Sequence, residues 1–302
     1  MLLGDTPLSA RILDGKSIAE QIKQEVAKET AELRGSGVQP GLTVVLVGND
    51  PASEQYVRNK VKACETLGIR SEKITPPTSI STAELLAIVK DLNARDDVDG
   101  ILVQLPLPSQ IDAQRVLLAV DPAKDVDGFH PVSVGNLVTQ RPGLRSCTPA
   151  GILEMLKRYQ IPIKGARAVV VGRSDIVGKP CAMLLLHEHA TVTICHSRTQ
   201  DLPGVCREAD ILVAAIGKAE MITADYIKPG ATVIDVGSNK VDDPAAPKGS
   251  RWTGDVHFES AKEVAGAITP VPGGVGPLTI AMLMANTLKA FRLRRGATAV
   301  VA

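Results

Sequence analysis

The sequence predicts a two-domain α/β protein in which helices alternate with the strands of parallel sheets. Three observations support this class. The chain has 302 residues, about twice the roughly 150 residues of a common domain. Apolar runs of strand length alternate with helical segments along the chain. In the second half these runs recur about every 20 residues, which is typical of parallel strands joined by crossovers.

The first half begins with a helix from Asp14 or Ser17 to Gly35 or Gly37. Further helices are expected from Pro51 to Gly68, from a capping pattern at Ser81 and Glu84 onward, and around 116–120. The apolar runs predict strands at 42–47, 69–74 and 100–105. The stretch from Asp121 to Cys147 is rich in proline and glycine, so we expect a loop and a domain junction there.

The second half continues the pattern. Strands are expected at 168–171, 191–195, 211–215 and 232–236, with a helix beginning near Lys179 or Pro180. The predicted domains are 1–145, an N-terminal α/β domain, and 146–277, a parallel-sheet domain. The last helix, 278–295, is expected to pack back on the first domain.

Composition excludes several classes of protein. Lys and Arg number 34 against 33 Asp and Glu, which argues against a nucleic-acid binder with a broad basic face. No apolar run reaches the length of a membrane span, and the start lacks the pattern of a secretory signal. The five cysteines show no CxxC pair, and His187 and His189 cannot face one ligand, so we expect a reducing cytoplasm and no metal.

The segment AVVVGRSDIVGKP predicts a phosphate-binding turn. A strand ends at Gly172, and a helix begins just after Gly178, so glycines allow close approach and the helix offers free N–H groups. The spacing is not the GxGxxG fingerprint, and an ordinary tight βα turn remains the alternative.

The end of the next strand favours NADP over NAD. An acidic residue usually accepts the ribose hydroxyl of NAD there, whereas this chain has His196, Ser197 and Arg198. Together with Arg173 in the turn, Arg198 fits a 2′-phosphate, although it could also be a solvated loop cation. The second domain is therefore predicted to be a Rossmann-like NADP domain.

The helix after Pro51 carries candidate catalytic residues. Ser53, Tyr56, Lys60 and Cys64 follow one another along one face. A tyrosine and a lysine four residues apart can share a pocket, the ring for stacking and the amine for proton transfer. Both could equally be surface or packing residues.

Polar residues beside this helix strengthen the hypothesis. Gln104 interrupts the apolar run GILVQL near its carboxyl end, where open α/β sheets bind ligands. A buried glutamine needs partners, which backbone groups alone could also supply. Asp125 and Asp127 follow in KDVDG, and either could bind the donor edge of a heterocycle or cap a turn.

Taken together, these segments resemble the bifunctional methylenetetrahydrofolate dehydrogenase/cyclohydrolase family. The matching stretches lie between about residues 12 and 290, in the family's order. They are SEQYVRNKVKACETLGI, VDGILVQLPLP, KDVDGFHP, CTPAG, VVVGRSDIVGKP, HSRT, GDV and TPVPGGVGPLT.

The resemblance implies a two-domain subunit with its active site in the interdomain cleft, and usually a homodimer. The family oxidises 5,10-methylenetetrahydrofolate with NADP⁺ and hydrolyses the methenyl product to 10-formyltetrahydrofolate. By position, Lys60 matches the catalytic lysine, Gln104 its partner, Tyr56 the residue that stacks on folate and Asp127 the carboxylate that binds the pterin. The resemblance implies Arg173, Ser174 and Ser197 as cofactor residues, to which the turn and the next strand end add Gly172 and Arg198. Pro272 and Gly273 fall where the family's ligands are covered.

Three other hypotheses remain to be weighed. A short-chain reductase also uses Tyr-x3-Lys, but there the pair follows the cofactor turn, whereas Tyr56 precedes Gly172 by over 100 residues. A shikimate-dehydrogenase-like enzyme shares the domain order but would not need DVDG or PGGVGP. A non-catalytic NADP-binding protein would not need Tyr56, Lys60, Gln104 and Asp127 together.

Overall fold

In the computed structural model, residues 9–246 and 249–295 are described, and they form two compact units. We call residues 19–147 and 280–295 the small-sheet unit, and residues 9–18 and 148–279 the large-sheet unit. The chain passes from one to the other within α1 (Gly15–Gly35), after Cys147, and within α10 (Val275–Arg294).

The small-sheet unit is built on three parallel strands. Their order is β3 (Arg70–Ile74), β2 (Gly41–Val45), β4 (Gly100–Val103), with Val45 beside both Ile74 and Val103. Every residue of β2 and β4 is buried. The flanking helices are α2 (Pro51–Leu67), α3 (Thr82–Ala94), α4 (Ala113–Ala119) and α5 (Pro131–Val138).

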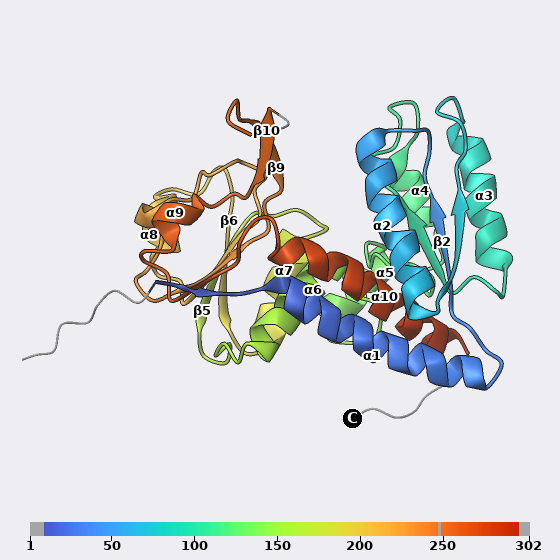
Figure 1. Ribbon diagram of the computed structural model, residues 1–302, viewed down its shortest axis with the longest axis horizontal. Coiled ribbons are helices and arrows are strands. Elements are labelled where there is room, and N and C mark those ends of the chain that lie inside the picture. Colours follow the sequence, from blue (N-terminus) through green and yellow to red (C-terminus); the bar gives the residue numbers. More distant parts are fainter. Residues whose placement is uncertain (1–8, 247–248, 296–302) are drawn as a thin grey trace, which may run out of the picture. The chain divides into compact units, whose positions relative to one another are not determined.

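Alternation along β2 explains why α2 and α3 lie on opposite faces of this sheet (Figure 1). Val44 packs in one apolar cluster with Val57 of α2, whereas Val45 packs in another with Leu85 of α3. Successive side chains of a strand point to opposite faces, so a continuous apolar strand needs cover on both. Leu288 of α10 belongs to the first cluster.

The large-sheet unit contains a six-stranded parallel sheet. Its order is β1 (Arg11–Ile12), β11 (Ala267–Ile268), β8 (Thr232–Asp235), β7 (Ile211–Ala214), β5 (Arg167–Val171), β6 (Thr191–Cys195). From β5 the chain goes first to β6 on one side and then to β7 on the other. That reversal creates a crevice at the carboxyl ends of β5 and β7, where doubly wound sheets bind ligands.

Short elements complete this unit. The helices are α6 (Cys147–Arg158), α7 (Gly178–His187), α8 (Leu202–Cys206), α9 (Phe258–Ala261) and a 3₁₀ turn (Ala224–Tyr226). Strands β9 (Asn239–Asp242) and β10 (Ser250–Thr253) pair as an antiparallel hairpin.

The predicted α/β class with parallel sheets is confirmed, with local differences. The expected division kept residues 1–145 together, but residues 9–18 lie in the large-sheet unit because β1 pairs with β11. The stretch expected to be a loop after Asp121 contains α5, which begins at Pro131, where proline suits a first helical turn. None of the described helices is long and apolar enough to span a membrane.

Candidate functional site

A lysine and a glutamine meet at the carboxyl edge of the small sheet. Lys60 lies on α2, and its Nζ donates a hydrogen bond of 2.9 Å to Oε1 of Gln104, which directly follows β4. Gln104 is itself fixed, because its Nε2 donates to the carbonyl oxygen of Leu105 at 2.6 Å. Both Lys60 and Gln104 are half-buried, so the pair remains accessible to a ligand.

The ends of α2 fix the position of Lys60 along the helix. Asp50 accepts the backbone N–H of Ser53 at 2.8 Å, and Pro51 occupies the first turn. At the other end Gly68 adopts a left-handed conformation with φ of 72°, which glycine adopts without steric cost.

The four candidate residues of α2 have different environments. Cys64 is fully buried against Met284, and burial raises the pKa of its thiol to about 12, so it packs rather than reacts. Ser53 is buried as well. Tyr56 exposes 48% of its surface beside Lys60, which leaves its ring free to stack on a ligand.

The two carboxylates of KDVDG, Asp125 and Asp127, differ in their hydrogen-bond partners. Asp125 is buried, and its Oδ2 accepts from the backbone N–H of His130 at 2.8 Å and from Oγ of Ser133 at 3.0 Å. No hydrogen bond from the described residues reaches the side chain of Asp127. Asp125 therefore holds the loop, and Asp127 is the carboxylate left for a ligand.

Asp127 is also electrostatically coupled to Lys60. Burial raises the pKa of Asp127 to about 6, with the charge of Lys60 pulling it down and that of Asp125 pushing it up. Asn286 of α10 holds the adjoining backbone, since its Nδ2 donates to the carbonyl oxygens of Val126 and Arg145 at 2.8 Å each. The small-sheet unit thus brings Lys60, Gln104 and Asp127 into one group.

The large-sheet unit has its own cavity, of about 300 Å³, at the carboxyl ends of β5, β6 and β7. Four predicted cofactor residues line it: Gly172, Arg173, Ser174 and Ser197. The cavity is also lined by Val171, His196, Leu202, Ala215, Ile216, Lys218 and Met221. Arg198 is exposed next to this wall, and its backbone N–H donates to Nδ1 of His196 at 3.1 Å.

The turn after β5 brings backbone segments very close together at the edge of the cavity. Gly172 has φ of 133°, and a Cβ there would lie 2.2 Å from the carbonyl oxygen of Ala215. A Cβ at Gly178 would lie equally close to the carbonyl oxygen of Gly172. Oγ of Ser174 accepts the N–H groups of Val177 and Gly178 at 3.2 Å. The two glycines therefore allow the backbone segments to approach closely at the start of α7, where Oγ of Ser174 takes two of the first N–H groups.

The PGGVG segment leads into α10 within the large-sheet unit. Gly273 has φ of 111°, and the N–H of Gly274 donates to the Pro270 carbonyl oxygen at 2.8 Å. A Cβ at Gly15 would collide with the carbonyl oxygen of Gly274, so α1 begins directly against this turn. Pro272 is exposed at its tip. Pro272 and Gly273 therefore lie in the unit that holds the dinucleotide cavity.

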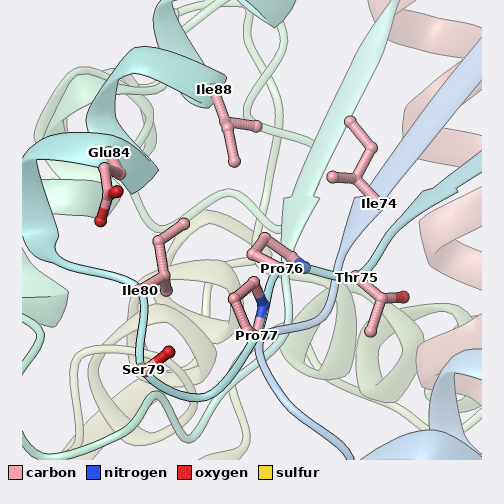
Figure 2. Close-up of a pocket in the computed structure, with 8 residues that line it drawn as sticks. All are labelled: Ile74, Thr75, Pro76, Pro77, Ser79, Ile80, Glu84 and Ile88. Atoms are coloured by element: carbon pink, nitrogen blue, oxygen red, sulfur yellow. The ribbon is translucent and has the colours of Figure 1, made fainter.

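A second cavity in the small-sheet unit, of about 370 Å³, lacks the chemistry of a reaction site. Figure 2 shows Ile74, Ile80 and Ile88 around it, together with prolines of the loop after β3. Its one carboxylate, Glu84, accepts hydrogen bonds from the N–H and Oγ of Ser81, which lower its pKa. That carboxylate is used to cap α3 and is not free for a ligand. Most of the other residues that line the cavity are isoleucines and prolines.

Comparison with known proteins identifies two domains along the chain, whose bounds differ from the two units at residues 13–18 and 280–295. The tetrahydrofolate dehydrogenase/cyclohydrolase catalytic domain matches residues 13–127, and the NAD(P)-binding domain of the same family matches residues 146–295. The chain belongs to the tetrahydrofolate dehydrogenase/cyclohydrolase family. It is similar to proteins called bifunctional protein FolD. That of Koribacter versatilis is 64% identical and covers 96% of the chain and 99% of the relative. That of Moorella thermoacetica is 56% identical and covers 94% and 100%.

Solved structures of the family have the same fold. The bifunctional enzyme FolD of Campylobacter jejuni is 44% identical, with a TM-score of 0.90 over 94% of this chain and 99% of that one. The Trypanosoma brucei enzyme, solved with NADP cofactor and an inhibitor, is 41% identical, with a TM-score of 0.89 over 96% and 99%. Shikimate dehydrogenase of Aquifex aeolicus, at 14% identity and a TM-score of 0.50, shares the fold alone.

The structure adds residues to this family's predicted site that the sequence did not single out. Lys218 lines the dinucleotide cavity, and Asn286 anchors the backbone beside Asp127. The sequence could have pointed to Lys218, because it follows closely on an apolar run of strand length. Asn286 lies on the last helix, 159 residues from Asp127, and no sequence pattern connects the two residues. In the described part of the chain, no three His, Cys, Asp or Glu residues are grouped to hold a metal ion.

Proposed function

We infer that this chain oxidises 5,10-methylenetetrahydrofolate with NADP⁺ and then hydrolyses the methenyl product to 10-formyltetrahydrofolate. The observation that carries the inference is the hydrogen bond between Lys60 and Gln104 beside Asp127, within the part matched by the family's catalytic domain. The second part of the chain matches the NAD(P)-binding domain, and the relatives are named as bifunctional.

For the folate, we propose that Asp127 accepts hydrogen bonds from the donor edge of the pterin. Its unoccupied acceptor atoms support this role. Tyr56 offers an exposed ring that stacks on the folate, and Pro272 and Gly273 cover the ligands. In the first step the carbon that loses hydride lies between two nitrogens, so the product cation is delocalised and the residues mainly orient the substrate.

For the dinucleotide, Gly172 and Ser174, which line the cavity, would hold its phosphates. Arg173, Ser197 and Arg198 would hold the 2′-phosphate of NADP through charge and bidentate geometry. NADP⁺, when bound, supplies the acceptor for the hydride. The bare turn at Gly172 and the basic side chains near the cavity are the observations that fit this cofactor.

Hydrolysis is the step that needs proton transfer. The water oxygen bonds to the methenyl carbon and gives up one proton, and a ring nitrogen accepts a proton as its bond to that carbon breaks. The remaining hydroxyl proton leaves to solvent as the formyl C=O bond forms, so the positive charge of the methenyl substrate is released as one proton. We propose that Nζ of Lys60, as the amine, takes the first proton and returns it to the nitrogen. Because Oε1 of Gln104 accepts one Nζ–H, it orients the lone pair of Nζ for this transfer.

The overall activity is tested by following absorbance of the methenyl product with NADP⁺ and, separately, with NAD⁺. We expect the product to appear faster with NADP⁺ and then to decay as it is hydrolysed. Absence of a signal with both dinucleotides would overturn the assignment.

The role of Lys60 is tested by Lys60→Met, with Lys62→Met as the control on the exposed side of the same helix. Loss of the proton-transfer group should lower cyclohydrolase turnover by at least about 100-fold. The dissociation constant for NADP⁺ should not change, because the dinucleotide cavity is in the other unit. Cyclohydrolase activity at the wild-type rate would refute the role.

The resemblance also supports a homodimer, and five free, buried cysteines fit a reducing cytoplasm. Light scattering should give a mass of about twice the 31.8 kDa of one chain. A mass of one chain at assay concentration would contradict the dimer.

A further inference from the structure

The wall of the dinucleotide cavity includes a loop, 215–218, in which three successive backbone N–H groups donate to one carboxylate. Ile216 and Lys218 line the cavity just after β7. On the other side of the backbone, Asp255 accepts the N–H of Ile216 at 2.6 Å, of Gly217 at 3.0 Å and of Lys218 at 2.9 Å. Gly217 takes a left-handed φ of 65° between them. One side chain thus binds three successive amides of the cavity wall.

Asp255 is itself rigidly placed. Its exposed fraction is 0%, and Nδ2 of Asn239 donates to its Oδ1 at 3.0 Å. A Cβ at Gly237 would lie 2.2 Å from the backbone nitrogen of Asp255, so only a glycine there allows this approach. Four charge-assisted hydrogen bonds to one buried carboxylate give it a single position.

A second buried carboxylate holds the segment that carries Asp255. Asp235, at the end of β8, accepts the N–H of Asp255 at 2.9 Å and of Val256 at 3.0 Å. A Cβ at Gly254 would collide with Asp235, which explains the glycine directly before the two residues whose N–H groups donate to Asp235. The Gly-Asp-Val segment therefore links the ends of β7 and β8.

We propose that Asp255 is a positioning residue for the dinucleotide: it fixes the loop 215–218 as a wall of the NADP cavity without touching the cofactor. This inference rests on the proposed function. A free loop would have to be ordered when the dinucleotide binds, and that cost would weaken binding. With its amides already bound, the loop presents the Lys218 side chain and the Ile216 surface in a fixed place.

The test uses Asp255→Asn in the full chain. The amide is close in size, but its NH₂ group faces backbone N–H donors, so at least one of the three hydrogen bonds is lost. Loss of one charge-assisted bond to the wall predicts a dissociation constant for NADP⁺ that rises about tenfold or more by calorimetry. The KM for NADP⁺ should rise with it.

The second reaction supplies an internal control. Cyclohydrolase turnover of added methenyltetrahydrofolate needs no dinucleotide, so it should stay within about twofold of wild type while NADP⁺ binding falls. Asp242→Asn, an exposed position on β9 of the same unit, should change neither quantity. Asn239→Ala, which removes one donor to Asp255, gives a milder variant and should raise the dissociation constant about two- to threefold.

The outcomes separate this inference from the proposed function. Equal NADP⁺ affinity in wild type, Asp255→Asn and Asn239→Ala would overturn the positioning role alone. A parallel fall of cyclohydrolase activity and NADP⁺ binding would also overturn it, because that is the effect of a general structural defect. Failure of the wild-type protein to bind NADP⁺ would overturn the proposed function, and with it this inference.

Discussion

At the scale of single residues, Asp125 and Asp127 show how two carboxylates of one loop take different tasks. Asp125 is buried and its acceptor atom serves His130 and Ser133, so it stabilises the loop. Asp127 has no such partners among the described residues, and burial raises its pKa to about 6 from 3.8. The carboxylate proposed to bind the pterin is therefore kept at a cost in stability, which is common at functional sites.

The sign of that cost gives a prediction for Asp127→Asn. The folded protein holds this proton more tightly than the unfolded chain, so the charged group lowers stability above pH 6, and the penalty disappears as pH falls toward 3.8. At pH 7.5 the variant should therefore be more stable, by about 1–3 kcal/mol, while folate turnover is lost. Thermal unfolding at pH 7.5 and pH 5 measures the difference, which should shrink at the lower pH.

Asp125→Ala is the matched comparison for Asp127→Asn. It removes the acceptor for the His130 N–H and the Ser133 hydroxyl, so stability should fall by about 1–3 kcal/mol at pH 7.5. If Asp127→Asn also destabilised the protein at this pH, Asp127 would have to be a structural residue like its neighbour.

At the scale of elements, the end of α3 depends on a lysine from another segment. Lys124 is 1% exposed, and its Nζ donates to the carbonyl oxygens of Leu92, Asn93 and Arg95 at 2.7–2.9 Å. The Asn93 and Arg95 carbonyls lie where the helix has run out of N–H donors, whereas the Leu92 carbonyl also accepts the N–H of Arg95 at 3.3 Å. The backbone oxygen of Lys124 also accepts the N–H of Ile101 in β4 at 2.8 Å. One side chain thus joins α3 to the start of the KDVDG loop.

Lys124→Met should be strongly destabilising. Methionine keeps the length of the side chain but removes the three hydrogen bonds that Nζ makes, so we expect a loss of about 2–5 kcal/mol in urea unfolding. Lys90→Met, on the exposed side of α3, should change stability by less than about 0.5 kcal/mol. A loss for Lys124→Met as small as that of the control would show that the three hydrogen bonds contribute little.

Elements with a strong local signal could be predicted from sequence, and those formed by tertiary pairing could not. The strand expected at 191–195 has those bounds as β6, because apolar and β-branched residues fill it. Strand β1 has only two residues with exposed side chains, and it exists because β11 offers backbone partners. The β9–β10 hairpin is polar and short, so no periodic pattern marks it.

The candidate site divides in the same way. Lys60 and Gln104 could be proposed because a polar residue at the end of a buried strand and a helix beside it imply a common edge. The choice between Asp125 and Asp127 needed the hydrogen bonds of Asp125. The link from Asp255 to the loop 215–218 joins positions 37–39 residues apart across two strand ends, which spacing alone cannot reveal.

At the scale of the whole molecule, the chemical groups are divided between two units. Lys60, Gln104, Tyr56 and Asp127 lie in the small-sheet unit, and the residues of the dinucleotide cavity lie in the large-sheet unit. In the proposed function, hydrolysis uses only the first group, whereas oxidation uses both. The two activities should therefore separate by mutation in a defined direction: cavity variants lose the oxidation and keep the hydrolysis.

Gly172→Ala tests that separation. The new Cβ would lie 2.2 Å from the Ala215 carbonyl oxygen at a φ of 133°, so the turn after β5 must move away from its cavity wall. We expect NADP⁺ binding and dehydrogenase activity to fall more than about tenfold, with cyclohydrolase turnover of added methenyltetrahydrofolate within about twofold of wild type.

Gly165→Ala is the control, because that glycine also has a positive φ, of 80°, but its Cβ would meet open space. It should share the backbone strain, about 1 kcal/mol, and keep both activities. Loss of hydrolysis in Gly172→Ala alone would mean that the cavity turn also supports the small-sheet unit, and the division of labour would be wrong.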